Sequence, residues 1–408
     1  MSRILLTACA VVFFCIASGD AEAGGEHGPD FSRYDWKEIN PGARWSPRAG
    51  LQAVQLKKRI YVMGGRTPRP PSFPPIPGDS DIWGDVWASD DLGVSWQRIL
   101  ETDDASHWPA RAYFQAVKKG RRMYVIGGQN FKVEANDCPP FVPGCPPFVS
   151  KSDFFNDVWS SRDGVNWVQH TPDAGWAKRA GLSAVVFRGE IYVMGGSFND
   201  DPAVIGGPPQ RIYFNDVWKS RYGFVWERVT EAAPWAPRAG AVAIVKGGYI
   251  YLIGGEDGFT CEPLPFCEPP YYNDVWRTKN GHDWEQVTAA AEWPARPGHQ
   301  CGVLQNRIIC FGGFGLLGNP KDMWASNDGA HWELISTSPW NAVTGEDVKY
   351  DFDAIVIKGA GHGQKPAIFT FGGDRETFDF DDPLNYLRVD NDVWRYSPPS
   401  RKHRSPRR

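Results

Sequence analysis

Six Gly-Gly pairs divide the chain at nearly regular intervals, and this repeat restricts the fold more than any other feature. Successive pairs are 58 to 68 residues apart, and their first members are Gly64, Gly127, Gly195, Gly254, Gly312 and Gly372. Each pair ends an apolar run with the character of a strand, as in "RIYVMGG", "EIYVMGG" and "AIFTFGG". A fixed period of this size indicates a repeat architecture, in which each unit buries its apolar face against its neighbours.

Four strands are predicted for each repeat. A second apolar run, such as "LSAVVF", precedes the run that ends in glycine, and a short turn joins the two as in a hairpin. After a loop of variable length, "NDVW" begins a third strand, and turns such as Asp163-Gly164 lead to a fourth strand such as "NWVQHT". Asp-Gly and Asn-Gly turns suit the twist of two antiparallel strands. Each unit is therefore predicted to be a four-stranded antiparallel sheet.

The two ends of the repeat array complement each other. The sixth unit ends at "NDVWRYSPP" and lacks a fourth strand, while "YDWKEIN", with Trp36, supplies such a strand before the first unit. With Trp36 included, the repeat accounts for 18 of the 19 tryptophans and leaves only Trp83. Pairing the two ends would close the sheets into a ring and protect their edges. We therefore expect an all-β, six-bladed β-propeller in which the N-terminal strand completes blade 6.

The paired glycines after an apolar strand, with a tryptophan downstream, resemble kelch repeats over about residues 34–396. The resemblance implies a propeller and extends more distantly to kelch sugar mutarotases and galactose oxidase. No residues match the copper ligands of galactose oxidase, so neither a metal nor another cofactor is expected. The stretch "SDDLGVSW", which ends at Trp96, also resembles the Asp-box turn of sialidases, which is structural.

The ends of the chain are predicted to lie outside the propeller. Residues 1–23 have the form of a secretory signal, with Arg3, a 14-residue apolar run and a cleavage site after Ala23. A membrane anchor is the alternative, but a span needs about 20 apolar residues. We expect a secreted or periplasmic protein with a linker at 24–33, no membrane span, and a basic, disordered tail at 397–408.

Six cysteines remain after the predicted cleavage, in three close pairs: Cys138 with Cys145, Cys261 with Cys267, and Cys301 with Cys310. Close pairs in an exported chain suggest disulfides, whereas zinc would favour tighter C-x-x-C spacing. In "CGVLQNRIIC" a two-residue turn at Gln305-Asn306 would place Cys301 opposite Cys310, at a close pair that a disulfide can span. Two buried free thiols are the alternative for this pair.

Net charge bears on the partners. The chain carries a formal charge of −4, although the tail "RKHRSPRR" holds five Arg or Lys residues, so the rest is more acidic still. An acidic body argues against nucleic acid as the main partner. We expect a monomer that binds an acidic glycan, or a protein or peptide ligand.

One arginine recurs before the first strand of every unit except the last, at Arg48, Arg111, Arg179, Arg238 and Arg296. These guanidinium groups would lie near one mouth of the central channel, where a planar fork of donors suits carboxylate or phosphate. In kelch domains, arginines at such positions help to bind acidic peptides, and the resemblance implies the same here. The alternative is structural, with each arginine bound to carbonyl groups or to the Asp of "NDVW". In the sixth unit, Lys349, Asp351 or Asp353 would take the arginine's place.

The loops after the glycines should lie on the same face, where binding usually resides. Their aromatic residues are candidates for stacking on a ligand: Phe131, Phe198, Phe259, Tyr271 and Tyr272. Glu256, Asp374 and Glu376 are the catalytic candidates, because general acid or base catalysis needs a carboxyl group beside the channel. The acidic residues Asp374, Glu376, Asp379, Asp381 and Asp382 could hold calcium, but their spacing matches no known calcium-binding loop. His299 is expected to lie in the core.

These features favour a non-catalytic, exported module that binds an acidic glycan or acidic peptide at the arginine-bearing mouth. The alternative is a sugar mutarotase or epimerase acting on an acidic sugar. A glycosidase of the sialidase type would need paired carboxylates, a nucleophilic tyrosine and an early R-I-P motif, and none is evident.

Overall fold

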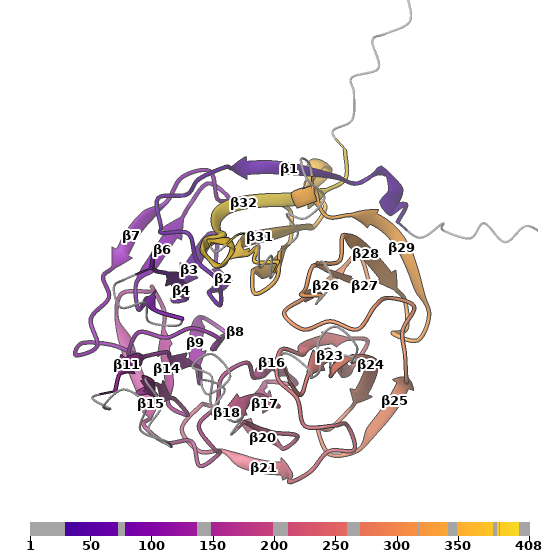
Figure 1. Ribbon diagram of the computed structural model, residues 1–408. Coiled ribbons are helices and arrows are strands. Elements are labelled where there is room, and N and C mark those ends of the chain that lie inside the picture. Colours follow the sequence, from indigo (N-terminus) through magenta and orange to yellow (C-terminus); the bar gives the residue numbers. More distant parts are fainter. Residues whose placement is uncertain are drawn as a thin grey trace, which may run out of the picture. The chain divides into compact units, whose positions relative to one another are not determined.

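The computed structural model describes residues 29–71, 78–136, 148–198, 211–258, 270–315, 319–341, 349–377, 382 and 384–399. The chain divides into two units, Met1–Asp30 and Phe31–Arg408, and all the strands described belong to the second. Four-stranded antiparallel sheets make up most of this unit, and Figure 1 shows the six of them arranged as a ring.

Each blade is a meander, and its strands run in chain order from the channel outward in blades 1 to 5. Blade 1 contains β2 (Gln52–Leu56), β3 (Arg59–Met63), β6 (Val86–Ser89) and β7 (Gln97–Leu100); blade 2 contains β8 (Gln115–Lys119), β9 (Arg122–Ile126), β14 (Val158–Ser161) and β15 (Trp167–Thr171); blade 3 contains β16 (Ser183–Phe187), β17 (Glu190–Met194), β20 (Val217–Ser220) and β21 (Glu227–Thr230).

Blade 4 contains β22 (Val242–Lys246), β23 (Tyr249–Glu256), β24 (Tyr271–Thr278) and β25 (Trp284–Thr288); blade 5 contains β26 (Gln300–Leu304), β27 (Arg307–Phe311), β28 (Asp322–Ser326) and β29 (Trp332–Thr337); blade 6 contains β30 (Asp353–Ile357), β31 (Ala367–Asp374), β32 (Val389–Ser397) and β1 (Asp35–Asn40). The first strand of each blade contacts the first strands of both neighbouring blades, so these six strands surround the channel. Figure 1 shows β1, β7, β15, β21, β25 and β29 on the outside.

The ring closes where the sequence predicts. Strand β1 pairs antiparallel with β32, with Trp36 opposite Tyr396 and Asp35 opposite Ser397. The N-terminal strand therefore supplies the outer edge of blade 6, and the predicted six-bladed propeller is confirmed.

The loops after the glycines contain short hairpins that the sequence did not reveal. These pair β4 (Arg66–Pro68) with β5 (Ser80–Ile82), β10 (Gln129–Asn130) with β13 (Asp153–Phe154), β11 (Val133–Ala135) with β12 (Phe148–Ser150), and β18 (Ser197–Phe198) with β19 (Ile212–Tyr213). Helical turns are confined to four short 3₁₀ segments within the described residues: η1 (Phe31–Arg33), η3 (Pro339–Asn341), η4 (His362–Gln364) and η5 (Asn385–Leu387).

Tryptophan pairs fill the spaces between blades. The tryptophan that precedes a blade meets the tryptophan of its fourth strand edge to face, with ring centroids 5.7–6.2 Å apart. The pair of Trp176 and Trp226, for example, belongs to a cluster with Val158 of blade 2 and Ile191 of blade 3. Aromatic pairs of this kind bury large apolar areas and favour an edge-to-face geometry. The periodic tryptophans are therefore packing residues.

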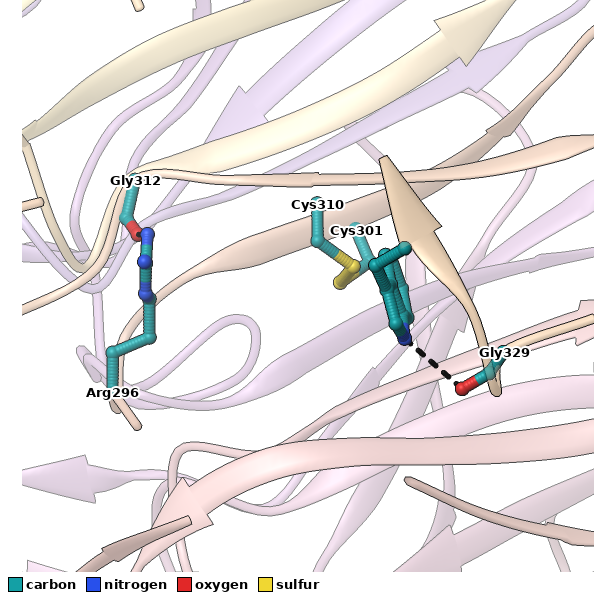
Figure 2. The surroundings of a disulfide bond; sticks show 6 residues. Arg296, Cys301, Cys310, Gly312 and Gly329 are labelled. Carbon is teal, nitrogen blue, oxygen red and sulfur yellow. Dashed lines mark hydrogen bonds between the residues drawn. A yellow bond between two sulfur atoms is a disulfide. The ribbon is translucent and has the colours of Figure 1, made fainter. Parts of the chain in front are cut away.

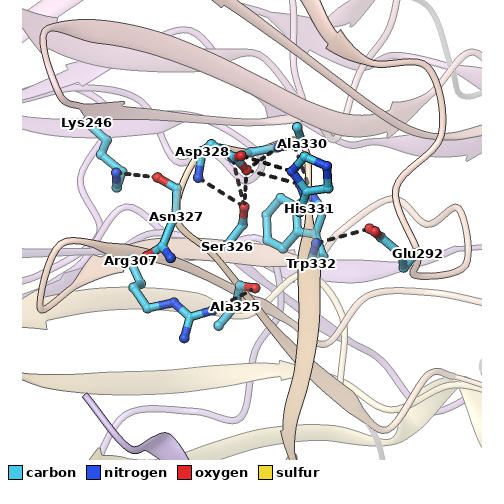
Figure 3. Close-up of polar contacts among 11 residues, drawn as sticks. Lys246, Glu292, Arg307, Ala325, Ser326, Asn327, Asp328, Ala330, His331 and Trp332 are labelled. Atoms are coloured by element: carbon cyan, nitrogen blue, oxygen red, sulfur yellow. Dashed lines mark hydrogen bonds and ion pairs between the residues drawn. The ribbon is translucent and has the colours of Figure 1, made fainter. Parts of the chain in front are cut away.

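The turn between the third and fourth strands has the same hydrogen bonds in five blades. In blade 5, shown in Figure 3, Ser326 Oγ accepts a hydrogen bond from the backbone N–H of Gly329, at 2.8 Å. Trp332 Nε1 donates to the carbonyl of Gly329, at 3.0 Å. Equivalent bonds occur at Ser89, Ser161, Ser220 and Thr278. The turn of blade 1 that resembles an Asp box in sequence thus has counterparts with the same two hydrogen bonds in blades 2 to 5, including blade 3, whose turn contains no Asp.

Cys301 and Cys310 form a disulfide between β26 and β27. They are directly opposite in the strand register, with their Cα atoms 4.2 Å apart, and Figure 2 shows the bond. Both cysteines belong to the same hydrophobic cluster as Trp332. Gln305 and Asn306 have φ values of 48° and 64°, as a tight two-residue hairpin turn requires. This predicted disulfide is confirmed. The pairs Cys138/Cys145 and Cys261/Cys267 lie outside the described residues.

Candidate functional site at the channel mouth

The five recurring arginines lie inside the protein. Their exposed fractions are 0–2%, and each guanidinium group binds the Asp of "NDVW" in its own blade through two hydrogen bonds. The Nη1–Oδ1 distances are 2.5–2.7 Å, and the acids are Asp85, Asp157, Asp216, Asp274 and Asp322. Nη1 also donates to the carbonyl of the first glycine of each pair, as for Arg296 and Gly312 in Figure 2.

These contacts agree with the alternative in which the arginines have a structural role, because the guanidinium groups donate their hydrogen bonds to acceptors of the protein itself. Nε of each arginine donates to a carbonyl two residues earlier, and an aromatic ring covers three of the groups closely: Phe155 over Arg111, Phe214 over Arg179 and Tyr272 over Arg238, at 3.9–4.0 Å. In blade 6, buried Lys349 takes the arginine's place, and its Nζ lies 2.5 Å from both Asp390 and Asp392. That the arginines bind a ligand stays a prediction, and the site described below consists of other residues.

The position directly after each glycine pair carries a different residue in every blade. These residues are Arg66, Gln129, Ser197, Glu256, Phe314 and Asp374. In each blade this residue pairs through its backbone with the residue that follows the recurring arginine, as Arg66 does with Ala49. In blade 6, which has Lys349 in place of the arginine, Asp374 pairs with Tyr350. The arginine–aspartate pairs are repeated in five blades, whereas the residues directly after the glycine pairs differ from blade to blade. These residues are therefore where the propeller can acquire specificity for a ligand.

Three adjacent blades bring six polar residues of this region together, and we call them the mouth cluster: Arg66, Tyr113, Tyr350, Asp351, Asp374 and Glu376. Arg66 Nε donates to the Tyr113 hydroxyl at 2.7 Å, and Arg66 Nη2 donates to Asp374 Oδ2 at 2.9 Å. Electrostatic interactions connect the rest of the cluster: the negative charge of Asp374 acts on Tyr350, Asp351 and Glu376, and the positive charge of Arg66 acts on all three carboxyl groups. Two hydrogen bonds from Arg66 and these charge interactions therefore join three carboxyl groups, one guanidinium group and two phenols in one cluster.

Burial and neighbouring negative charge raise the pKa values of the carboxyl groups in the mouth cluster. Loss of hydration raises the pKa of Asp351 to about 7, helped by the negative charge of Asp374 and opposed by Arg66. The pKa of Glu376 rises to about 7 for the same two reasons, and burial also raises the pKa of Asp374. Asp374 has no exposed side-chain surface, while that of Arg66 is 20% exposed. Near neutral pH the cluster can therefore both donate and accept protons.

The cluster adjoins a cavity in the channel of about 230 Å³. Tyr113 and Asp351 line it, together with residues at the beginning of all six innermost strands, including Gln52, Ser183 and Gln300. A ligand in the channel would thus meet the cluster first through Tyr113 and Asp351.

The three catalytic candidates from sequence do not form one group. Asp374 and Glu376 belong to the mouth cluster, whereas Glu256 lies on blade 4, opposite Tyr271 in the strand register. Sequence reasoning missed Arg66, Tyr113 and Tyr350. Tyr113 had a usable signal, because it replaces the glycine of "RAG" in a repeated position.

The other candidates are placed as follows. His299 is 2% exposed, and burial lowers its pKa to about 3, so it is a neutral core residue as expected. Phe198 packs on Phe154, Tyr271 packs on Phe314, and Phe259 lies outside the described residues. Asp379 and Asp381 also lie outside them, and no three His, Cys, Asp or Glu residues in the described ranges are grouped to hold a metal ion. No helix among the residues described is long and apolar enough to span a membrane.

No protein-family model matches the chain, and no curated protein matches it.

Proposed function

We propose that this chain is an exported kelch-type propeller that binds a carbohydrate at the mouth cluster. The kelch assignment rests on the repeated glycine pairs and tryptophans, and the propeller fold is consistent with a binding module. Export is supported by the apolar N-terminal sequence and by the Cys301–Cys310 disulfide, since structural disulfides persist in oxidising compartments.

The observation that carries the proposal is the mouth cluster itself. Carboxyl groups accept hydrogen bonds from sugar hydroxyls, and Tyr113 offers an aromatic face at the cavity wall. For an acidic sugar, Arg66 provides a cation, and the raised pKa values of Asp351 and Glu376 provide carboxylic acid donors below neutral pH. Above neutral pH the ionised cluster would repel a carboxylate. We therefore propose an acidic sugar as the preferred ligand, bound more tightly at mildly acid pH.

The second candidate is a sugar mutarotase or epimerase. It is favoured by one observation: Glu376 and Asp351, both with pKa values raised to about 7, belong to the same mouth cluster. General acid–base catalysis is most efficient when the pKa of the catalytic group lies close to the working pH. Opening of a pyranose ring needs one group to protonate the ring oxygen and another to remove the proton of the anomeric hydroxyl.

One NMR experiment tests both the binding function and the mutarotase or epimerase activity. Galacturonic acid and galactose, which differ only at C6, would be mixed separately with the purified protein at pH 5.5 and pH 8. Saturation transfer reports binding, and exchange between the anomer signals reports catalysis. The binding proposal expects saturation transfer to galacturonic acid at pH 5.5 that weakens about tenfold or more at pH 8. Saturation transfer to neither sugar would overturn it, and accelerated anomer exchange would establish the enzyme instead.

A further inference from the structure

Six residues form a ring at the neck of the channel, each two positions before the innermost strand of its blade. They are Gly50, Tyr113, Gly181, Gly240, Gly298 and Asp351, and all have left-handed backbones with φ between 50° and 64°. Backbone hydrogen bonds of 2.8–3.0 Å run between neighbouring blades, from Tyr113 N–H to the Gly50 carbonyl, from Gly50 N–H to the Asp351 carbonyl, and onward. All six residues line the channel cavity.

Glycine is the residue that this backbone favours, since other residues meet a steric penalty at positive φ. The chain itself supplies the comparison, because four of its six blades have glycine at this position. Tyr113 and Asp351 adopt the same conformation, with φ values of 54° and 50°. Neither is required to build the ring, so their side chains are retained at a cost in backbone strain.

Both side chains lie along the wall of the neck. A Cβ atom on Gly50 would lie 3.0 Å from the Tyr113 ring, and one on Gly298 would lie 2.7 Å from Asp351 Oδ1. Tyr113 thus extends over Gly50 of blade 1, and Asp351 extends over Gly298 of blade 5. They place a phenol and a carboxyl group in the same cavity, on an otherwise glycine-lined neck.

We propose that Tyr113 and Asp351 are the ligand-contacting pair that determines which sugars enter the neck. In the protonated form that the proposed function assigns to it below neutral pH, the Asp351 carboxyl group donates a hydrogen bond to one pyranose hydroxyl and accepts one from an adjacent hydroxyl. The Tyr113 ring packs on the apolar face of the sugar. This inference rests on the proposed carbohydrate function and adds to it the residues that select the sugar. Arg66 Nε donates a hydrogen bond to the Tyr113 hydroxyl, which helps to hold the tyrosine ring in position.

The proposal is tested by substituting each of the two neck residues and one control residue. Asp351→Gly gives blade 6 the glycine that four other blades have, and Tyr113→Phe removes the hydroxyl that accepts a hydrogen bond from Arg66. Lys57→Gly is the matched control, since Lys57 is exposed, lies in the β2–β3 turn and has a φ of 59°. Thermal unfolding and saturation transfer to galacturonic acid and galactose at pH 5.5 would be measured for all three variants and the wild type.

The inference predicts that Asp351→Gly unfolds at the wild-type temperature or about 1–2 °C higher and loses at least tenfold in affinity. Tyr113→Phe should lose affinity to a similar degree, and Lys57→Gly should bind as the wild type does. Neck variants that bind normally would overturn the inference while leaving the carbohydrate function intact. A loss of binding together with a fall of several degrees in unfolding temperature would also overturn it, because the pair would then be structural. If the wild type binds neither sugar, the proposed function fails first and the inference fails with it.

Discussion

Arg179 holds Asp216 through two parallel hydrogen bonds, 2.5 and 2.9 Å long, inside blade 3. The same carboxylate accepts a third bond from Trp218 Nε1, at 2.8 Å. Arg179 in turn binds the carbonyl of Gly195, which connects the glycine pair, the arginine and the "NDVW" strand in one unit. Five blades repeat this arrangement, which explains why these sequence elements recur together.

Loss of one such arginine should damage the fold. Arg179→Ala leaves the largely buried Asp216 without its cation, and removing one member of a buried ion pair costs about 3–5 kcal/mol of unfolding free energy. Urea denaturation followed by tryptophan fluorescence would measure this. Arg228→Ala is the control, because its ion pair with Glu231 is exposed and should contribute about 1 kcal/mol or less. If Arg179→Ala, alone or with Arg238→Ala, folds normally but loses sugar binding, these arginines are ligand residues after all.

Stability should fall as pH rises from about 4 to about 7. Burial raises the pKa of Asp351, Asp353 and Glu376 to about 7, so the folded state binds more protons than the unfolded state in this interval. Each group contributes up to about 1.4 kcal/mol per pH unit where only the folded state is protonated. Denaturation midpoints at pH 5 and pH 7.5 would show the decline, and a midpoint that rises over this interval would contradict it.

The contribution of Asp353 to this pH dependence of stability can be measured separately. Its carboxyl oxygens accept hydrogen bonds from the N–H groups of Ala53 in blade 1 and Ala354 in blade 6, across the closure of the ring. Asp353→Asn removes the titrating proton and one acceptor. We expect a less stable variant whose stability changes less between pH 5 and pH 7.5. An unchanged pH slope would show that Asp353 titrates normally.

Reduction of the Cys301–Cys310 disulfide should lower the unfolding free energy by about 2–3 kcal/mol, because the bond closes a short loop in the unfolded chain. The paired substitution Cys301→Ala with Cys310→Ala gives a variant for comparison. Reductant should destabilise the wild type by about 2–3 kcal/mol more than it destabilises this variant, because only the wild type can lose the Cys301–Cys310 bond. Equal denaturation curves for oxidised and reduced wild type would contradict the prediction.

Substitution of Glu376 tests the origin of the pH dependence of sugar binding, and substitution of Glu256 is its control. Glu376→Gln removes one of the carboxyl groups with a raised pKa and should flatten the pH dependence of galacturonic acid binding. Glu256→Gln, on blade 4, should retain the wild-type profile. The profile is measured by titration between pH 5 and pH 8. A stronger effect from Glu256→Gln would move the site to blade 4.

The scaffold was predictable because it is repeated. The glycine pairs, "NDVW" and the Asp-Gly turns fix strand order and hairpin register locally, and the disulfide of "CGVLQNRIIC" follows from that register. The mouth cluster was only partly predictable. Arg66 and Asp374 are 308 residues apart in sequence and meet only because the ring closes between blades 6 and 1. The role of the arginines could not be decided from sequence, because their pattern is the same whether their partner is a ligand or an internal Asp.

The central claim, that an acidic sugar binds at the mouth cluster, is tested most directly by a crystal structure of the protein with galacturonic acid at pH 5.5. The account predicts the sugar in the channel neck, with its carboxylate hydrogen-bonded to Arg66 and its hydroxyls to Asp351. A sugar bound on another surface, with Arg66, Tyr113 and Asp351 contacting only one another, would contradict it.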